Sequence, residues 1–436
     1  MRLDFAFGKI GLTLEFPPGY EYLTLEARAA KPLTDAAAAL GRALDHPIDC
    51  PPLAELARGA SSVAISVCDI TRPAPNRLTL PPLLERLASA GLSKDRTRIL
   101  IATGLHRAAT KEEIFEILGP AIASRYPVYN HDARNLASHR FLGITSTGTP
   151  VYVDERFVSA DLRISLGFIE PHLMLGFSGG RKLVAPGLAA QETIKVLHSP
   201  KFMRDPLAVE GSIDENPLHR ELLEIARMAG HGFILDVALA PGLENGARRI
   251  AGVFAGDPVA AHRKGVEFVS RTLLDRLEGP VDAVVTSAAG YPLDLTFYQA
   301  IKGITAAQHI LKPGGRILIV AECREGAGAA EFAEMLAGFG SYKAFLGAIR
   351  EREVVVDQWQ LEKLAIAGAR YEVLSYVPGL PARYRQHFGG NMFDSPQAAV
   401  NRLMTGLTRG AQVALIPEGP YVLARVGSET ASVASS

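Results

Sequence analysis

Cysteine is scarce in this 436-residue sequence. The three cysteines, Cys50, Cys68 and Cys323, are far apart and form no CxxC pair. Zinc ribbons and disulfide-stapled scaffolds need closely spaced or paired cysteines, so the sequence favours neither. Such sparing use of cysteine suits a reducing compartment.

An excess of charge of one sign is also missing. Lysine plus arginine total 46, and aspartate plus glutamate total 46. Nucleic acids and anionic membranes select a cationic surface, so the balance argues against both as partners. Segment 1–9 contains an early acid and no apolar core, and no apolar run approaches the roughly 18 residues of a membrane helix. We therefore expect a cytoplasmic protein. The length predicts about two or three domains, and 48% hydrophobic residues exclude disorder over most of the chain.

Common nucleotide-binding motifs are absent as well. The glycine-rich segment 176–182 resembles a phosphate loop, but Arg181 stands where that motif needs its second glycine, and Leu183 stands where it needs serine or threonine. No G-x-G-x-x-G stands at the end of an expected strand, so an ordinary dinucleotide site has no support.

What the sequence does contain is an alternation of strands and helices. Apolar runs at 62–68, 98–102 and 162–168 predict strands, and segments such as 82–92 and 217–228 predict helices. The pattern predicts an α/β fold with a mainly parallel sheet, whose ligands bind beyond the carboxyl ends of the strands. The polar segments after Cys68 and after Ala102 should therefore lie at one edge of the sheet.

The rhythm begins again after Gly279-Pro280. Residues 282–287 and 316–320 predict strands, 296–311 predicts a helix, and 258–277 predicts a helix before the break. We therefore expect two α/β domains, residues 1–272 and 273–436.

Several candidate functional residues follow expected strands. His106 lies in a Thr-Gly-x-His-Arg turn, His172 follows Glu170-Pro171, and His198 ends an expected helix. Each histidine alone is more often structural. Their combination with Lys182 and with the Asp69/Arg72 turn weakens that interpretation. An arginine in a proline-flanked turn suits capture of a carboxylate or phosphate, and a lysine after two glycines meets little side-chain bulk.

The second domain contributes a polar pair and an indole. Gln299 and Lys302 are three residues apart on an expected helix, so they share a face. An amide and an ammonium together can hold a small carboxylate or a ketone oxygen, although such a pair alone is usually a solvated face. Trp359 is the only tryptophan and lies in a polar setting, where it can wall a site.

Taken in order from about residue 60 to about residue 420, these motifs resemble the nickel-dependent lactate racemase family of 2-hydroxyacid racemases and epimerases. The resemblance is carried by the following motifs: Asp69-x-Thr71-Arg72-Pro73, Ala102-Thr-Gly-Leu-His106-Arg107, Pro171-His172, Gly176-Phe-Ser-Gly-Gly-x-Lys182, His198, Gly290-Tyr-Pro-Leu-Asp294, Gln299-x-x-Lys302 and Asp357-x-Trp359.

The resemblance implies two α/β domains with Rossmann-like, mainly parallel sheets and the active site in the cleft between them. Residues 1–272 would carry the cofactor anchor and the acid/base histidines, and residues 273–436 would contribute substrate-binding residues. The implied cofactor is the nickel-pincer nucleotide, pyridinium-3-thioamide-5-thiocarboxylic acid mononucleotide with nickel, covalently attached at Lys182. Other proteins would synthesise and install this cofactor.

The resemblance also assigns roles residue by residue. His106 and His172 would be the acid/base pair, and His198 would bind nickel. The remaining residues would hold the nucleotide (Asp69 and Thr71) or the substrate (Arg72, Gln299, Lys302 and Trp359). One departure is Arg181, directly before Lys182, where a small residue would leave the loop less encumbered.

The implied reaction is racemisation or epimerisation of a small, lactate-type 2-hydroxy acid. The hydrogen on C2 is a poor acid, and reversible hydride transfer to the cofactor avoids a carbanion. A base meanwhile takes the hydroxyl proton, and histidine, with an unperturbed pKa of about 6.5, suits that task. Arg72 and Lys302 would supply cationic donors to the carboxylate and carbonyl oxygens.

Two other hypotheses fit the same residues. Lys182 amid histidines would also serve a Schiff-base lyase or aldolase. A non-catalytic protein that binds 2-hydroxy acids would use the same binding residues without turnover.

Overall fold

A computed structural model describes residues 1–27, 30–240, 248–338, 340–350, 353–385 and 391–427. The chain forms two compact units. Unit 2 comprises Ala29–His198 and Asp205–Arg271, and unit 1 comprises Met1–Arg28, Ser199–Arg204 and Thr272–Ser436.

Unit 2 is built on a six-stranded sheet. Its strands lie in the order β13 (Ile250–Gly256), β12 (Phe233–Leu239), β9 (Leu162–Phe168), β4 (Val63–Cys68), β5 (Thr97–Ala102) and β6 (Val128–Asn130). All neighbours are parallel except β12 and β13. The predicted strands 62–68, 98–102 and 162–168 are therefore confirmed. Every residue of β4 is buried, as expected for a strand covered on both faces.

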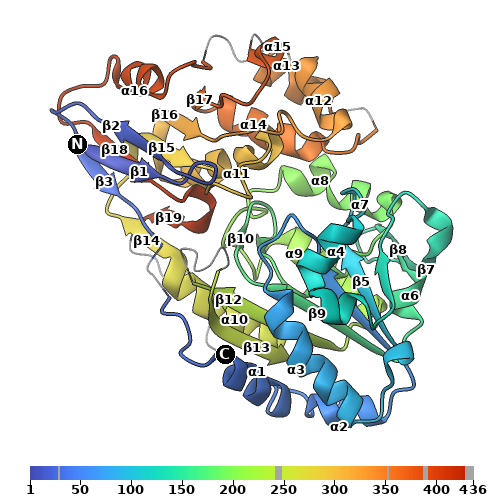
Figure 1. Ribbon diagram of the computed structural model, residues 1–436. Helices are drawn as coiled ribbons and strands as arrows, with labels where there is room; N and C mark the ends of the chain where they lie inside the picture. Colours follow the sequence, from blue (N-terminus) through green and yellow to red (C-terminus); the bar gives the residue numbers. More distant parts are fainter. Residues whose placement is uncertain (28–29, 241–247, 339, 351–352, 386–390, 428–436) are drawn as a thin grey trace. The chain divides into compact units, whose positions relative to one another are not determined.

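Helices and short turns cover this sheet (Figure 1). One face packs against α1 (Ala36–Asp45), α2 (Leu53–Arg58), α3 (Asn76–Ser89) and α4 (Lys111–Leu118) through leucine-rich surfaces. The other face contacts α6 (Glu155–Val158) and the 3-10 turn η3 (Gly180–Leu183), against which α9 (Pro217–Met228) packs. The remaining elements of the unit are η1 (Lys94–Arg96), α5 (Pro120–Ala123), η2 (Leu136–Ser138), β7 (His139–Ile144), β8 (Pro150–Asp154), β10 (Pro171–His172), β11 (Gly176–Phe177), α7 (Gln191–Leu197) and α10 (Ala260–Leu273).

Unit 1 contains a five-stranded sheet that is parallel throughout. The strand order is β17 (Glu372–Tyr376), β16 (Leu311–Val320), β15 (Val281–Ser287), β18 (Gln412–Ile416) and β3 (Glu21–Thr24). The predicted α/β class with two domains and mainly parallel sheets is thus confirmed. We expected residues 1–272 to form one domain. Pairing of β3 with β18 instead joins residues 1–28 to the C-terminal sheet.

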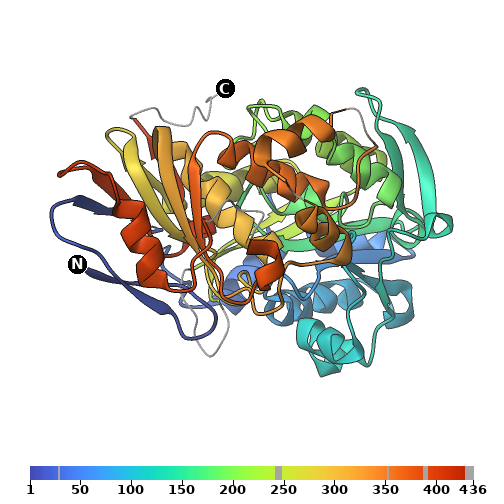
Figure 2. The same cartoon turned by 90° about the horizontal axis from the view of Figure 1, so that it is seen from above.

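A helix with a β-hairpin covers one face of this second sheet, and a group of helices covers the other (Figure 2). On one face α16 (Pro396–Met404) packs with the hairpin of β1 (Arg2–Phe5) and β2 (Leu12–Glu15). On the other face lie α11 (Phe297–Ala307), η4 (Gln308–Ile310), α12 (Ala330–Ala337), α13 (Tyr342–Ala348) and α14 (Gln358–Gly368). The smaller elements are α8 (Pro200–Met203), β14 (Leu274–Leu277), α15 (Ala382–Arg385), η6 (Gly419–Tyr421) and β19 (Leu423–Val426).

Two helix boundaries differ from the prediction. The helix expected at 82–92 is α3, which begins at Asn76 and contains Pro81 and Pro82. Burial of its leucines offsets the backbone hydrogen bonds that prolines inside a helix remove. The helix expected at 258–277 ends at Leu273, because residues 274–277 pair with β19 as strand β14. Among the described residues, no helix has the length and apolar character needed to cross a bilayer.

Helix α11, which carries Gln299 and Lys302, lies unusually close to the sheet. A Cβ added at Gly303 would lie 2.4 Å from the carbonyl oxygen of Ser287. We therefore predict that Gly303→Ala lowers the free energy of unfolding by about 1–3 kcal/mol, the usual cost of overpacking. The matched control is Gly347→Ala in α13, where a Cβ has nothing within 4 Å. It should raise stability by a few tenths of a kcal/mol through helix propensity. Urea denaturation of both variants checks this, and equal effects would contradict the close packing.

Candidate active site

Strand ends of unit 2 bring the candidate residues together. Cys68 and Ala102 are directly paired, so Asp69 and Thr103 emerge side by side, as predicted. The chain runs from β4 to β5 and β6 on one side and later returns to β9 on the other side of β4. The strand order therefore reverses between β4 and β9, and ligands of open α/β sheets bind at such a point.

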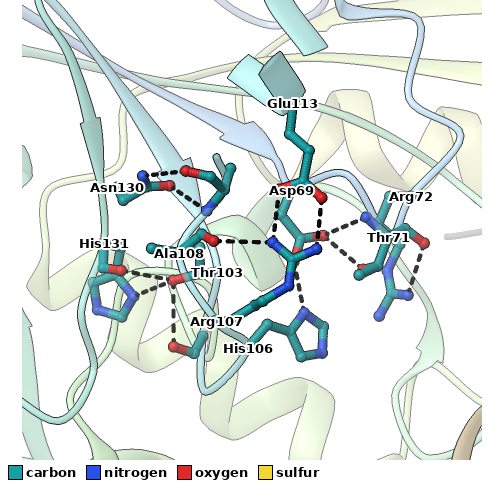
Figure 3. Close-up of polar contacts among 12 residues, drawn as sticks. Asp69, Thr71, Arg72, Thr103, His106, Arg107, Ala108, Glu113, Asn130 and His131 are labelled. Atoms are coloured by element: carbon teal, nitrogen blue, oxygen red, sulfur yellow. Dashed lines mark hydrogen bonds and ion pairs between the residues drawn. The ribbon is translucent and has the colours of Figure 1, made fainter. Parts of the chain in front are cut away.

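Asp69 holds His106 in place (Figure 3). His106 Nδ1 lies 2.6 Å from Asp69 Oδ2, and the hydroxyl of Thr71 donates to Oδ1 at 2.7 Å. Burial alone would raise the pKa of Asp69, but the His106 hydrogen bond and the charges of His106 and Arg72 lower it to about 2. The carboxylate is thus ionised at neutral pH and can only accept. His106 Nδ1–H therefore donates in this contact, and in the neutral ring the lone pair lies on Nε2.

Backbone contacts fix the turn that carries His106. Thr103 Oγ1 donates to the carbonyl of His131 at 2.8 Å, and the N–H of His106 donates to the carbonyl of Thr103. Gly104, at φ +55°, donates to the carbonyl of Gly187. Gly187 in turn donates to the carbonyl of Lys182, so the His106 turn and the Lys182 segment are joined.

Lys182 belongs to η3, which lies across β4 and β9. The hydroxyl of Ser66 on β4 donates to the carbonyl of Leu183 at 2.8 Å. Burial, and next the positive charge of Arg72, lower the pKa of Lys182 to about 7. Much of this amine is therefore neutral and nucleophilic near neutral pH.

His198 caps the C-terminal end of α7. Its Nδ1 lies 2.8 Å from the carbonyl oxygen of Ile194, which can only accept a hydrogen bond. The proton therefore sits on Nδ1, and Nε2 has the lone pair that a metal ligand needs. Burial, and to a smaller extent the nearby Lys182 charge, lower the pKa of His198 to about 4. This histidine is neutral at physiological pH.

His172 lies on the short strand β10, which pairs with β11 opposite Gly176. The N–H of Met174 donates to His172 Nδ1 at 3.4 Å. In this arrangement Nδ1 accepts and Nε2 carries the proton, the reverse of His106. Glu170, two residues earlier, is close enough to Lys182 to oppose the lowering of its pKa.

The candidates in unit 1 cluster around the start of α11. Thr296 caps the helix by accepting from the N–H of Gln299. The side-chain oxygen Oε1 of Gln299 is buried without a hydrogen-bond partner among the described residues. A buried carbonyl oxygen of this kind is ready to accept a hydrogen bond from a ligand. Lys302, on the next turn of the helix, is half-buried.

Trp359 supports this helix from the side. It is only 4% exposed, and its indole N–H donates to the hydroxyl of Tyr298 at 3.0 Å. The Gln360 side chain donates to the Tyr298 carbonyl at 2.8 Å. Trp359 and Gln360 thus fix Tyr298 beside Gln299.

Comparison with known proteins gives this arrangement a context. The sequence model of the lactate racemase N-terminal domain matches residues 7–211, and that of the C-terminal domain matches residues 277–424. The chain belongs to the lactate racemase family. Members of this family are isomerases, and the chain is a 2-hydroxyacid racemase of the family.

Individual family members resemble the chain over nearly its whole length. It is 32% identical to a lactate racemase of Thermoanaerobacterium thermosaccharolyticum, covering 97% of this chain and 99% of that protein. It is 35% identical to a lactate racemase of Lactiplantibacillus plantarum, covering 88% and 90%. The lactate racemase apoprotein structure from T. thermosaccharolyticum superposes with a TM-score of 0.89 at 31% identity, covering 98% and 100%. A Thermotoga maritima protein shares the fold at 19% identity, with a TM-score of 0.67 and coverage of 90% and 97%.

Among the described residues, no three His, Cys, Asp or Glu side chains gather closely enough to hold a metal ion.

Sequence reasoning overlooked one buried acidic residue near the candidate site. The buried carboxylate of Asp236, which touches the glycine-rich loop, was not singled out. The signal was available, because Asp236 interrupts an otherwise apolar run at 233–239.

The Asp69 carboxylate generates a testable stability effect. Its pKa is lower in the folded chain, about 2, than the roughly 3.9 of an unfolded aspartate. Ionised Asp69 therefore stabilises the fold fully above pH 4, and this contribution disappears as the pH falls toward 2. We predict that Asp69→Asn costs about 2 kcal/mol at pH 7 and clearly less at pH 3. Denaturant unfolding at pH 7, 4 and 3 measures the gap between the two proteins, and a gap independent of pH would contradict this account.

Proposed function

We propose that the chain interconverts the two enantiomers of a small, lactate-type 2-hydroxy acid. The observation that carries the proposal is the grouping at one strand edge: a histidine oriented by an ionised carboxylate and joined through the backbone to a lysine of lowered pKa. Relatives named lactate racemase, similar over nearly the whole chain, support the choice of substrate class.

The cofactor we propose is the nickel-pincer nucleotide, held covalently by Lys182 and through its nickel by His198. Three features support the fit. The pKa of the Lys182 amine is lowered to about 7, His198 Nε2 has a lone pair, and Lys182 closely follows Gly179 and Gly180 in the sequence. Asp69 and Thr71 at the end of β4 are our candidates for seating the nucleotide. When bound, this group supplies a hydride acceptor at C2 of the substrate.

His106 and His172 divide the proton transfers between them. His106 Nε2 has a lone pair, so it accepts the proton of the substrate hydroxyl, and Asp69 stabilises the resulting imidazolium. His172 serves the opposite enantiomer in the same way: as an imidazolium it donates a proton to the carbonyl oxygen, and as a neutral ring it takes the hydroxyl proton in the reverse direction.

Cationic and amide groups orient the substrate. Arg72 in unit 2 and, in unit 1, Lys302 and the side-chain N–H of Gln299 are our candidates for binding the carboxylate and polarising the carbonyl oxygen. Trp359 contributes by holding Tyr298 beside Gln299. Cofactor-synthesis proteins are the partners that this proposal requires.

Mass spectrometry and nickel analysis test the anchor. Chain co-produced with cofactor-synthesis proteins should carry a nucleotide-sized adduct on the peptide containing Lys182 and about one nickel per chain. Lys182→Met should lose the adduct, whereas the control Lys195→Met in α7 should keep it. His198→Gln should keep the adduct but lose most of the nickel. An unmodified, metal-free wild-type chain would overturn the cofactor assignment. A borohydride-trapped keto-acid adduct at Lys182 would favour the Schiff-base alternative.

Racemisation kinetics test the two histidines. Each of His106→Gln and His172→Gln should lower kcat for lactate by roughly 10²–10⁴-fold, the usual contribution of a general acid or base. Asp69→Asn should reduce kcat less, because it removes the orienting partner and keeps the imidazole. Chiral chromatography of lactate, started from each enantiomer, measures these rates. A variant retaining more than half of wild-type kcat from both enantiomers would remove that histidine from the mechanism.

A further inference from the structure

Arg181, the residue directly before Lys182, has the largest side chain among the fully buried residues that the structure describes. It is 1% exposed. Burial lowers the pKa of its guanidinium to about 9, so the group still carries its charge at neutral pH. A buried charge is costly unless polar groups surround it, so its partners reveal what the side chain does.

Those partners are carbonyl groups of the glycine-rich loop itself. Nη2 donates to the carbonyl oxygens of Phe177 at 2.9 Å and Leu175 at 3.3 Å, and Nη1 donates to that of Gly179 at 3.2 Å. A planar guanidinium can reach several carbonyls at fixed angles at once, which the point-like ammonium of lysine cannot do. Arg181 therefore holds the backbone of residues 175–179 from the buried side of the loop.

Asp236 on β12 packs against the same loop and is a partial countercharge to Arg181. A Cβ at Gly179 would lie 2.5 Å from Asp236 Oδ2, so the carboxylate packs directly against the loop backbone. Burial raises the pKa of Asp236 to about 7, although the positive charge of Arg181 opposes the shift. Gly179 also has φ +87°. Both the close approach and the backbone angle therefore require glycine at this position.

His262 on α10 closes the cluster. Its Nε2 lies 2.7 Å from Arg181 Nη1 and 2.7 Å from the carbonyl oxygen of Ser178. One ring nitrogen can satisfy only one of these contacts at a time, because it has either a proton or a lone pair. Burial, together with the Arg181 charge, keeps the pKa of His262 well below its usual value. Its ring stacks on His219, whose pKa is also lowered by burial and by Arg181. Arg181 thus carries the positive charge of the cluster.

Lys182 has different neighbours from Arg181. The charged and thiol groups that act most strongly on Lys182 are Arg72, Glu170 and Cys68, near the ends of β4 and β9. These two consecutive side chains therefore lie in two different environments. Arg181 secures the loop in the interior, and Lys182 is presented at the strand edge.

We propose that Arg181, together with Asp236 and His262, is an internal clamp that positions the glycine-rich loop so that Lys182 can receive its cofactor. Arg181 is a positioning residue, because it touches the loop and not the reacting atoms. The inference rests on the proposed anchoring role of Lys182.

The test compares Arg181→Met and Arg181→Lys with wild type, and uses Arg163→Met as matched control. Arg163 also donates to backbone carbonyls, those of Ala160 and Gly230, at the opposite end of β9. Two readouts are needed. Hydrogen–deuterium exchange of the apo chain follows the amides of 175–182, and intact mass after co-production with cofactor-synthesis proteins gives the fraction of chain carrying the adduct.

We expect Arg181→Met to speed exchange in 175–182 by about tenfold or more, as loss of one to two hydrogen bonds would, and to reduce the adduct fraction at least severalfold. Arg181→Lys should also speed exchange. Lysine keeps the positive charge but lacks the planar guanidinium that reaches several carbonyls at once. Arg163→Met should leave both readouts at wild-type values even if its global stability falls.

Wild-type exchange in 175–182 for a folded Arg181→Met chain would overturn the clamp. If that variant does not fold, Arg181→Lys decides alone by the same criterion. Faster exchange with an unchanged adduct fraction would also overturn the positioning role. A wild-type chain without adduct would instead count against the proposed cofactor, while the exchange result would still decide whether Arg181 holds the loop.

Discussion

The rest of the candidate site depends on how closely one helical turn, η3, packs against β4 and β9. Ser66 ties the turn to β4, and a Cβ at Gly167 on β9 would lie 2.8 Å from Leu183 Cδ1. The absence of a side chain at Gly167 therefore lets the turn lie directly on the sheet. As a result Lys182 reaches the edge where the strand order reverses, and its backbone connects through Gly187 to the turn of His106.

At this edge two ionisable groups are shifted in ways that suit different tasks. Asp69 is buried, but hydrogen bonds from His106 and Thr71 and the charge of Arg72 keep it ionised. Lys182 is half-buried near Arg72, and both desolvation and the arginine charge favour its neutral form. The same arginine thus stabilises a carboxylate and discourages an ammonium. One small site can in this way contain both a histidine oriented by a carboxylate and an amine that is partly neutral.

Much of the fold was readable in the sequence, because alternating apolar runs and turn residues report local structure. The strands after which Asp69 and Thr103 emerge are correct to within a residue or two. The errors occurred where distant segments compete with local preference. Residues 274–277 continue a helical pattern but pair with β19, and β3 joins a sheet whose other members lie more than 250 residues later.

For the site, the sequence by itself determined the residue types and their order: the histidines, the lysine after two glycines, and the polar pair on α11. These are local features of turns, strand ends and helix faces. Only the tertiary structure decided their states. It showed that Asp69 orients His106, that Ile194 selects the tautomer of His198, and that Arg181 is buried against the carbonyls of its own loop and His262. Protonation and orientation depend on burial and on partners distant in sequence, and spacing along the chain carries no information about either.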